Sequence, residues 1–262
     1  YTGSAGTGDA GLVMNGSETF VTKPYKFYVF SEDANASCAS ASPTCTAFKR
    51  ANETFNLKIR AACSDDTVTP NFQLNNIAVS HINVAPAVSQ GTLGVSSFNM
   101  VAADNGEHTI STQTVSEVGS FNFTAAAPSG AYFGEDIGTT ALNTSSDIGR
   151  FYPAHFCISS PSLTNRTDAD TASGCTDGFS YLDEIFTVGV TMTAQNFGSA
   201  CGAGGVTQNY TGAWSKFTTP FSENTALPAE AGKWNFAAVN NPGVSATDLS
   251  ARITIDTTNS SG

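Results

Sequence analysis

The side chains of this sequence that could carry out chemistry are three histidines, six cysteines and 22 aspartates and glutamates. Nucleophilic catalysis of the α/β-hydrolase type needs a Gly-x-Ser-x-Gly turn between a strand and a helix, and the sequence contains no such pentapeptide. His81, His108 and His155 are far apart in the sequence, with no catalytic motif around them. We therefore expect the histidines to be structural and the protein not to be an enzyme.

The cysteines form no Cys-x-x-Cys pair and have no histidine at the usual spacing of zinc ligands, which disfavours a zinc site. Their even number and the low content of charged residues instead fit disulfides in an oxidising compartment. Two local bridges are predicted, Cys38–Cys45 and Cys157–Cys175, because each would close a polar loop that buries too little surface to order itself. The remaining two, either free thiols or a bridge between the halves of the chain, are Cys63 and Cys201.

Acidic residues provide a candidate calcium loop. The segment Asp168-Ala-Asp170 begins like such a loop, and carboxylate and carbonyl oxygens are suitable calcium ligands. The pattern then departs from the EF-hand, since Ala172 stands at the third ligand position and Phe179 at the closing glutamate. The alternative is a solvated loop, and no cofactor other than this calcium is predicted.

A glycan-acting enzyme would need two carboxylates facing each other across a cleft, roughly 5–9.5 Å apart. Adjacent residues of a strand point to opposite faces of the sheet, so a doublet inside a strand cannot serve as such a pair. Asp183 and Glu184 are the first candidates for the carboxylates of such an enzyme. The alternative is that they protect the edge of a strand.

Three aromatic residues could stack on a sugar ring if their faces are exposed, namely Tyr210, Trp214 and Trp234. The alternative for each is a place in the hydrophobic core, where β-sandwiches commonly use aromatic side chains. An exposed ring beside polar groups would favour a carbohydrate-binding face.

Strands must position all of these residues. Phe55, Leu57 and Ile59 alternate with polar residues, and the same period of two continues through residues 186–193, which predicts two half-buried strands. Helical periodicity is almost absent, and 24 glycines and ten prolines interrupt the chain. Further strands are predicted at residues 27–30, 77–79, 98–101, 121–124, 151–158, 210–217, 234–239 and 252–255.

This pattern predicts an all-β fold with two immunoglobulin-like β-sandwich domains in tandem. Residues 135–147 carry little apolar periodicity and are expected to form the join. We therefore place an N-terminal sandwich at residues 1–147 and a C-terminal sandwich at residues 148–262. Residues 1–11 and 257–262 are rich in Gly, Ser and Thr and are expected to be linkers.

The composition excludes several partners. The formal net charge is −11, so a phosphate backbone would be repelled and nucleic acid is excluded. The longest apolar stretches are far shorter than the ~20 residues that span a bilayer, so no membrane span is expected in this segment. Charged residues make up 13% of the chain, about half of the usual ~25%, so the surface must be formed largely by Ser, Thr, Asn and Gly.

Residues 148–156, Ile-Gly-Arg-Phe-Tyr-Pro-Ala-His-Phe, closely resemble part of the uncharacterised domain found in MshQ-like proteins. Those proteins are encoded with the mannose-sensitive haemagglutinin type IV pilus of Gram-negative bacteria. The resemblance continues with Cys175 before the Phe179-Ser-Tyr181 segment and with the stretch from Asn209 to Trp214. It covers roughly residues 20–217, and the family has no established catalytic residues to carry over.

The resemblance implies an exported, non-enzymatic module at the cell surface of a Gram-negative bacterium, associated with a pilus or forming a fibre. Such a module would present or space an adhesive region, and its partners would be other pilus or surface-protein domains or further copies of itself. A glycan is a further candidate ligand. The alternatives are a carbohydrate- or calcium-binding module and, third, the glycan-acting enzyme.

Within the resembling motif, four residues are expected to have a structural role between the domains: Gly149, Arg150, Phe151 and Pro153. Glycine permits an unusual backbone conformation, and proline is accepted at the edge of a strand. Arg150 could pair with a carboxylate of the other domain.

Overall fold

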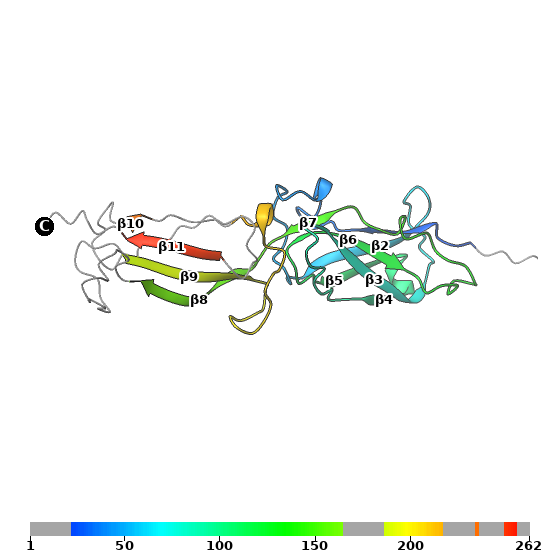
Figure 1. Ribbon diagram of the computed structural model, residues 1–262. Helices are drawn as coiled ribbons and strands as arrows, with labels where there is room; N and C mark the ends of the chain where they lie inside the picture. The colour runs from blue at the N-terminus through cyan, green and yellow to red at the C-terminus, as the bar shows by residue number, and fades with distance from the viewer. Residues whose placement is uncertain (1–21, 165–185, 217–233, 236–248, 256–262) are drawn as a thin grey trace, which may run out of the picture.

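The computed structural model describes residues 22–164, 186–216, 234–235 and 249–255. These residues form three antiparallel sheets, and the helices among them are short 3-10 turns, which confirms the all-β fold class. The sheets lie along one axis, with a sandwich built from β1 to β7 at one end and the sheet of β8 to β11 at the other (Figure 1). In this described part, no helix has the length and apolar character needed to cross a membrane.

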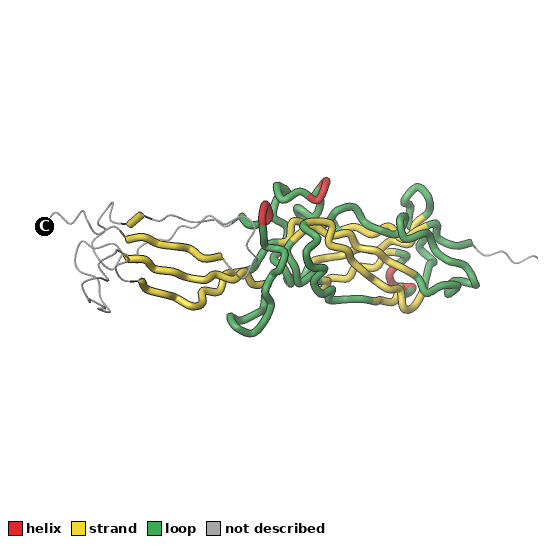
Figure 2. Tube along the Cα trace, viewed as in Figure 1, coloured by secondary structure: helices red, strands yellow, loops and turns green. Residues whose placement is uncertain are grey.

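The first sandwich consists of two sheets that enclose one core. The three-stranded sheet has the order β1 (Lys26–Phe30), β2 (Phe55–Ala62) and β5 (Glu107–Gln113). The four-stranded sheet has the order β4 (Ser97–Met100), β3 (Leu74–Ala85), β6 (Gly119–Ala126) and β7 (Ile148–Phe151). Loops, turns and the short 3-10 helices at Ala39–Ala41 and Ala102–Asp104 form the remainder of this unit (Figure 2).

Strand β2 shows why the sequence adopts this arrangement. Phe55, Leu57 and Ile59 are buried, whereas the residues between them are half-buried, which confirms the predicted alternation. Successive side chains of a strand point to opposite faces, so one face of β2 covers the core and the other carries polar side chains. β1 and β5 pair with β2 on its two sides and leave it at the centre of its sheet.

Phenylalanines fill the core between the two sheets. Phe151 is fully buried, and its ring meets those of Phe48, Phe55 and Phe121 at centroid distances of 5.2, 5.5 and 5.5 Å in edge-to-face geometry. Such contacts contribute about 0.5–1.5 kcal/mol each beyond the burial of apolar area. Phe151 comes from β7 and Phe55 from β2, so the cluster ties the two sheets together.

The first sandwich extends as far as β7. Gly119 and Phe121 of β6 pair with β7, and Ile137 contributes a buried side chain to the same core. Residues 135–147, which the sequence suggests as the join, therefore pack within this unit. The chain leaves it through residues 152–154.

Pro153 separates two strands that the sequence predicts as one. The expected strand at residues 151–158 is divided into the end of β7 and the start of β8 (His155–Thr164). The two strands belong to different sheets, because β8 pairs with β9 (Phe186–Gln195). The described part of the second half is a sheet of order β10 (Trp234–Asn235), β11 (Leu249–Ile255), β9 and β8.

Two disulfides are present among the described residues. Cys38 bonds to Cys45, as predicted. Cys157 bonds to Cys201, which corrects the predicted pairing of Cys157 with Cys175. The reason is that the loop after β9 returns to β8 and brings Cys201 beside Cys157. Cys63 is exposed and takes part in neither bridge. Because Cys201 is bonded to Cys157, the alternative bridge between Cys63 and Cys201 does not form. Cys175 lies outside the described residues.

Candidate functional site

The candidate functional site is the junction where the first sandwich contacts the loop after β9. Phe197 is in that loop, and its backbone N–H donates to the carbonyl of Ala51 at 2.7 Å. Its own carbonyl accepts from the side-chain amide of Asn52 at 3.0 Å, and the Arg50 guanidinium lies 4.2 Å from the centroid of its ring. One residue of the second unit is thus held by three consecutive residues of the first.

Asn209 makes the second set of contacts across this junction. Its side-chain oxygen accepts from the Ser89 N–H at 2.7 Å, and its side-chain nitrogen donates to the carbonyls of Ser89 and Val118 at 2.8 and 2.9 Å. The Asn209 side chain is fully buried. A buried amide with this number of partners fixes both the position and the orientation of the segment that carries it.

Glu117 provides a buried carboxylate beside Asn209. Its two oxygens accept backbone N–H groups of Gln208 at 2.8 Å, Asn209 at 3.1 Å and Val118 at 3.2 Å. Burial raises the pKa of the Glu117 carboxyl, and the three N–H donors offset only part of that effect. The carboxylate therefore connects the start of β6 to the loop of the second unit without a basic partner among its hydrogen bonds.

A small apolar cluster completes the junction. It consists of Ala51, Val118, Ala194, Tyr210 and Trp214. Tyr210 and Trp214 are only 5% and 6% exposed, so neither ring offers a free face to a sugar, which corrects the expectation that they stack on a ligand. They belong to a loop with a 3-10 helix at Gly212–Trp214, not to the strand expected at residues 210–217 (Figure 2). The side chain of Trp234 lies outside the described residues.

The motif residues Gly149 to Pro153 support the junction from within the first sandwich. Gly149 has a φ of +76°, and a Cβ there would lie 2.7 Å from the Phe151 ring and 2.8 Å from the Phe48 ring. Glycine is therefore required both by the backbone and by the packing of the core. Pro153 lies in the connection between β7 and β8.

Arg150 has a different partner from the expected one. Its Nε donates to the carbonyl of Cys45 at 2.6 Å, and its own backbone carbonyl accepts from the N–H of Phe48. Among the described residues its recorded side-chain partner is thus this carbonyl and not a carboxylate of the other unit. Arg150 fastens the loop closed by the Cys38–Cys45 disulfide to β7.

Four acidic residues of the described chain lie together in one hollow, and each has a partner of its own. Asp65, Asp66, Asp104 and Glu107 line an open hollow of about 720 Å³ together with Arg60. Each carboxylate has its own partner there: Arg60 with Glu107, Lys26 with Asp66, His108 with Asp104 and Thr67 with Asp65. The hydroxyl and the N–H of Thr67 lower the pKa of Asp65. Outside the described residues lie the candidates Asp168, Asp170, Asp183 and Glu184.

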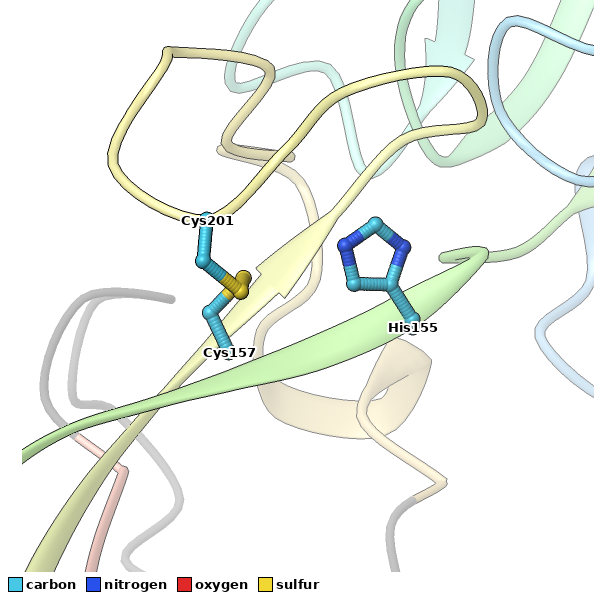
Figure 3. A group of neighbouring side chains, drawn as sticks. All are labelled: His155, Cys157 and Cys201. Carbon is cyan, nitrogen blue, oxygen red and sulfur yellow. A yellow bond between two sulfur atoms is a disulfide. The ribbon is translucent and has the colours of Figure 1, made fainter.

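One group of metal-ligating atoms does come together, at His155, Cys157 and Cys201 (Figure 3). His155 and Cys157 are two residues apart in β8, so their side chains share a face of the strand. Cys201 comes from the loop after β9, and the His155 ring nitrogen and both sulfur atoms lie within 4.8 Å of one another. The two sulfurs are joined as the Cys157–Cys201 disulfide.

Sequence reasoning missed this group. A His-x-Cys step inside a strand places two ligands on one face, and that spacing is the signal that could have indicated it. The third member is 44 residues from Cys157, and no local pattern marks it. No role is predicted from the sequence for Glu117 or for Asn196, whose side-chain amide donates to the Ser116 carbonyl at 3.3 Å, because single polar residues carry no motif. Asn209 enters only as the first residue of a stretch that resembles the domain of MshQ-like proteins.

Two family models match the chain. Residues 23–115 match the model described as DUF6701, second domain, and residues 117–260 match DUF6701, third domain. Together the two matches extend over most of the chain. Searches among curated proteins and among solved structures gave no significant match.

Proposed function

The chain belongs to the DUF6701 family, and on that premise we propose that it is a non-enzymatic spacer module of an exported surface protein. In this proposal it is associated with a pilus or forms a fibre, and it holds an adhesive region at a distance from the cell. Its partners are then neighbouring domains of the same surface protein or further copies of the chain. The resemblance of residues 148–156 to the domain of MshQ-like proteins supports the pilus setting.

The observation that carries the proposal is the junction of the two units. A spacer must keep its domains in line, and domains joined by a bare linker move relative to one another by default. Here Glu117, Asn209 and Phe197 make hydrogen bonds across the junction, and the connection through residues 152–154 is short. These contacts resist bending at the position where a two-domain chain is weakest.

The chemistry of the chain is compatible with an exposed location. Disulfides persist in oxidising compartments, and two are present in the described part. With charged residues at 13% of the chain and a net charge of −11, the protein would interact weakly with other acidic surfaces. We also propose that both units have the immunoglobulin-like topology.

The cellular part of the proposal is tested by immunogold electron microscopy of cells that express the native protein. Gold particles on surface fibres or at the outer envelope are expected. Gold confined to the cell interior would contradict the proposal. Labelling of cells from which the coding sequence has been deleted is the control.

The mechanical part is tested by residual dipolar couplings of the 262-residue chain. We expect the couplings of both units to fit one alignment tensor in the wild type and two different tensors in Asn209→Ala. The matched control is Asn75→Ala, at an exposed position of β3 away from the junction contacts. A wild-type chain that already needs two tensors would rule out a rigid spacer.

A further inference from the structure

The Cys157–Cys201 disulfide and His155 together have the composition of a metal site. Two cysteine sulfurs and one imidazole nitrogen are a ligand set for a soft or borderline cation, with Zn²⁺ the common example in proteins. As a disulfide, the sulfurs hold no thiolate and do not bind such an ion. The question is therefore what the same three residues do after the disulfide is opened.

The geometry suits a bound ion once the sulfur atoms separate. Zn–S bonds of about 2.3 Å and Zn–N bonds of about 2.0–2.1 Å place the donors of a tetrahedral site ~3.5–4.0 Å apart. The three donor atoms already lie within 4.8 Å of one another, so the imidazole needs little movement. Opening the bond must move the sulfurs from ~2.0 Å to ~3.8 Å, a change of less than 2 Å.

The loop that carries Cys201 has room for this movement. Residues 201–204 are exposed, and a Cβ added at Gly202 or Gly204 would meet no atom within 4 Å. The base of the loop is fixed, because the Asn196 N–H donates to the Gly205 carbonyl at 2.8 Å and Gln195 pairs with Val206. The tip can therefore adjust while the loop stays folded over β8.

A neighbouring side chain is placed to orient the imidazole. Gln195 of β9 lies directly opposite His155 in the β8–β9 pairing, so the two side chains point to the same face of the sheet. Gln195 is 3% exposed, and its Oε1 atom has no hydrogen-bond partner among the described residues. Metal-binding histidines usually donate their second N–H to such an oxygen, which fixes the ring and its tautomer.

We propose that His155, Cys157 and Cys201 form a redox-controlled metal site that binds one Zn²⁺ ion when the disulfide is reduced. A fourth position would remain open for water or a ligand, since the three side chains supply three donors. The oxidised form holds the loop to β8 by a covalent bond, and the reduced form holds it through the ion. The contacts of Asn196 and Phe197 with the first unit are retained in both states.

The redox step is a thiol–disulfide exchange with a dithiol reductant. A thiolate of the reductant attacks one sulfur of the disulfide, the S–S bond breaks, and the other cysteine leaves as a thiolate. The second thiol of the reductant then displaces the first cysteine, so the reductant becomes a cyclic disulfide and the protein gains two electrons. Zn²⁺ replaces the proton on any cysteine that is present as a thiol. Oxidised glutathione reverses the process and releases the ion.

The test uses a variant that retains only the two cysteines of the site, with Cys38→Ala, Cys45→Ala, Cys63→Ser and Cys175→Ser. The variant is reduced, freed of reductant without air and titrated with Zn²⁺ against a chromophoric chelator, and Co²⁺ is used as a spectroscopic probe. We expect one ion per chain, a thiolate-to-Co²⁺ charge-transfer band, and at least about tenfold weaker binding in His155→Ala. The matched control His81→Ala, at a histidine of β3, should leave the affinity unchanged.

Three results would overturn the proposal. The first is equal affinity of the reduced protein with and without His155, and the second is binding of equal strength by the oxidised protein. The third is loss of the near-ultraviolet circular dichroism of the reduced chain, since the site requires the folded loop. If the two-cysteine variant itself does not fold, the same titration compares the reduced full chain with its Cys201→Ser variant, and equal stoichiometry in the two has the same meaning.

Discussion

The buried charge of Glu117 destabilises the folded state at the junction. Glu117 is 3% exposed, and its carboxylate accepts three backbone N–H groups and has no basic side chain among its hydrogen-bond donors. The raised pKa of this group indicates that desolvation outweighs those donors. The residue therefore fixes the geometry of the junction while its charge opposes folding.

The sign of the pH dependence follows from that raised pKa. Between the ordinary glutamate pKa of 4.5 and the raised value, the folded state binds more protons at Glu117 than the unfolded state, so this contribution to stability falls as pH rises. We expect the free energy of unfolding of Glu117→Gln, minus that of the wild type, to increase as pH rises through this window. Urea denaturation at a series of pH values measures the difference.

The control for this prediction removes one negative charge from the surface. Glu135→Gln serves, because the Glu135 side chain is exposed and its carboxylate forms an ion pair with the Nζ of Lys23 at the surface. Subtracting its profile leaves the part that is specific to the buried carboxylate. A difference that is flat or falls with pH would show that Glu117 is not destabilised by burial.

Adding a single Cβ atom at Gly149 should lower the free energy of unfolding. Gly149→Ala adds a Cβ that collides with Phe48 and Phe151 at a φ of +76°, so we expect a loss of about 2–4 kcal/mol. Gly134→Ala is the matched control, since Gly134 has a φ of +82° and nothing within 4 Å of an added Cβ. The control should lose only about 1–2 kcal/mol. Equal losses in urea denaturation would mean that packing at Gly149 contributes nothing.

At the scale of elements, alternation of apolar and polar residues identified β2 and β9 from the sequence, but it failed at β5. That strand reads Glu-His-Thr-Ile-Ser-Thr-Gln, with a single aliphatic residue. Gln113 takes a fully buried position and satisfies its amide by exchanging hydrogen bonds with the backbone of Val95, each at 2.9 Å. A core position filled by a hydrogen-bonded polar side chain leaves no hydrophobic signal.

The same distinction separates the parts of the candidate site that were predictable from those that were not. The Cys38–Cys45 bridge closes a loop of local sequence, so its spacing was informative. Cys157 and Cys201 meet because β9 returns beside β8 and its following loop folds back, which depends on long-range pairing. The sequence predicts a strand over residues 210–217, whereas Tyr210 and Trp214 anchor a loop through burial at the junction, which depends on long-range packing.

The two disulfides should differ in how much they stabilise the chain. Cross-linking reduces the entropy of the unfolded state by an amount that grows with loop length, about 4 kcal/mol for a separation of 44 residues and about 2.5 kcal/mol for a separation of 7. We expect Cys157→Ala/Cys201→Ala to lose more stability than Cys38→Ala/Cys45→Ala. Guanidinium unfolding of the two double variants makes the comparison, and the reverse order would count against a loop-entropy origin.

At the scale of the whole molecule, the boundary between the two family matches and the boundary between the sheets differ. The matches divide between residues 115 and 117, whereas β6 pairs with β3 and β7 pairs with β6, both within the first sandwich. A fragment of residues 22–153 should therefore fold alone. A fragment of residues 22–115 should not, because it lacks the buried side chains of Phe121, Phe123 and Phe151. Dispersion of amide signals in NMR spectra distinguishes the outcomes, and two equally folded fragments would refute the prediction.

The order of the strands also determines how a pulling force would pass through the first sandwich. Lys26 pairs with Ala62 at the end far from the junction, and β1 runs from there toward the junction. β7 also runs toward the junction and leaves the unit there (Figure 1). Tension between these two points is directed along the strands, so the hydrogen bonds of β1 to β2 and of β6 to β7 are loaded in shear and share the load. A sandwich whose chain entered and left at the same end would open its bonds one after another.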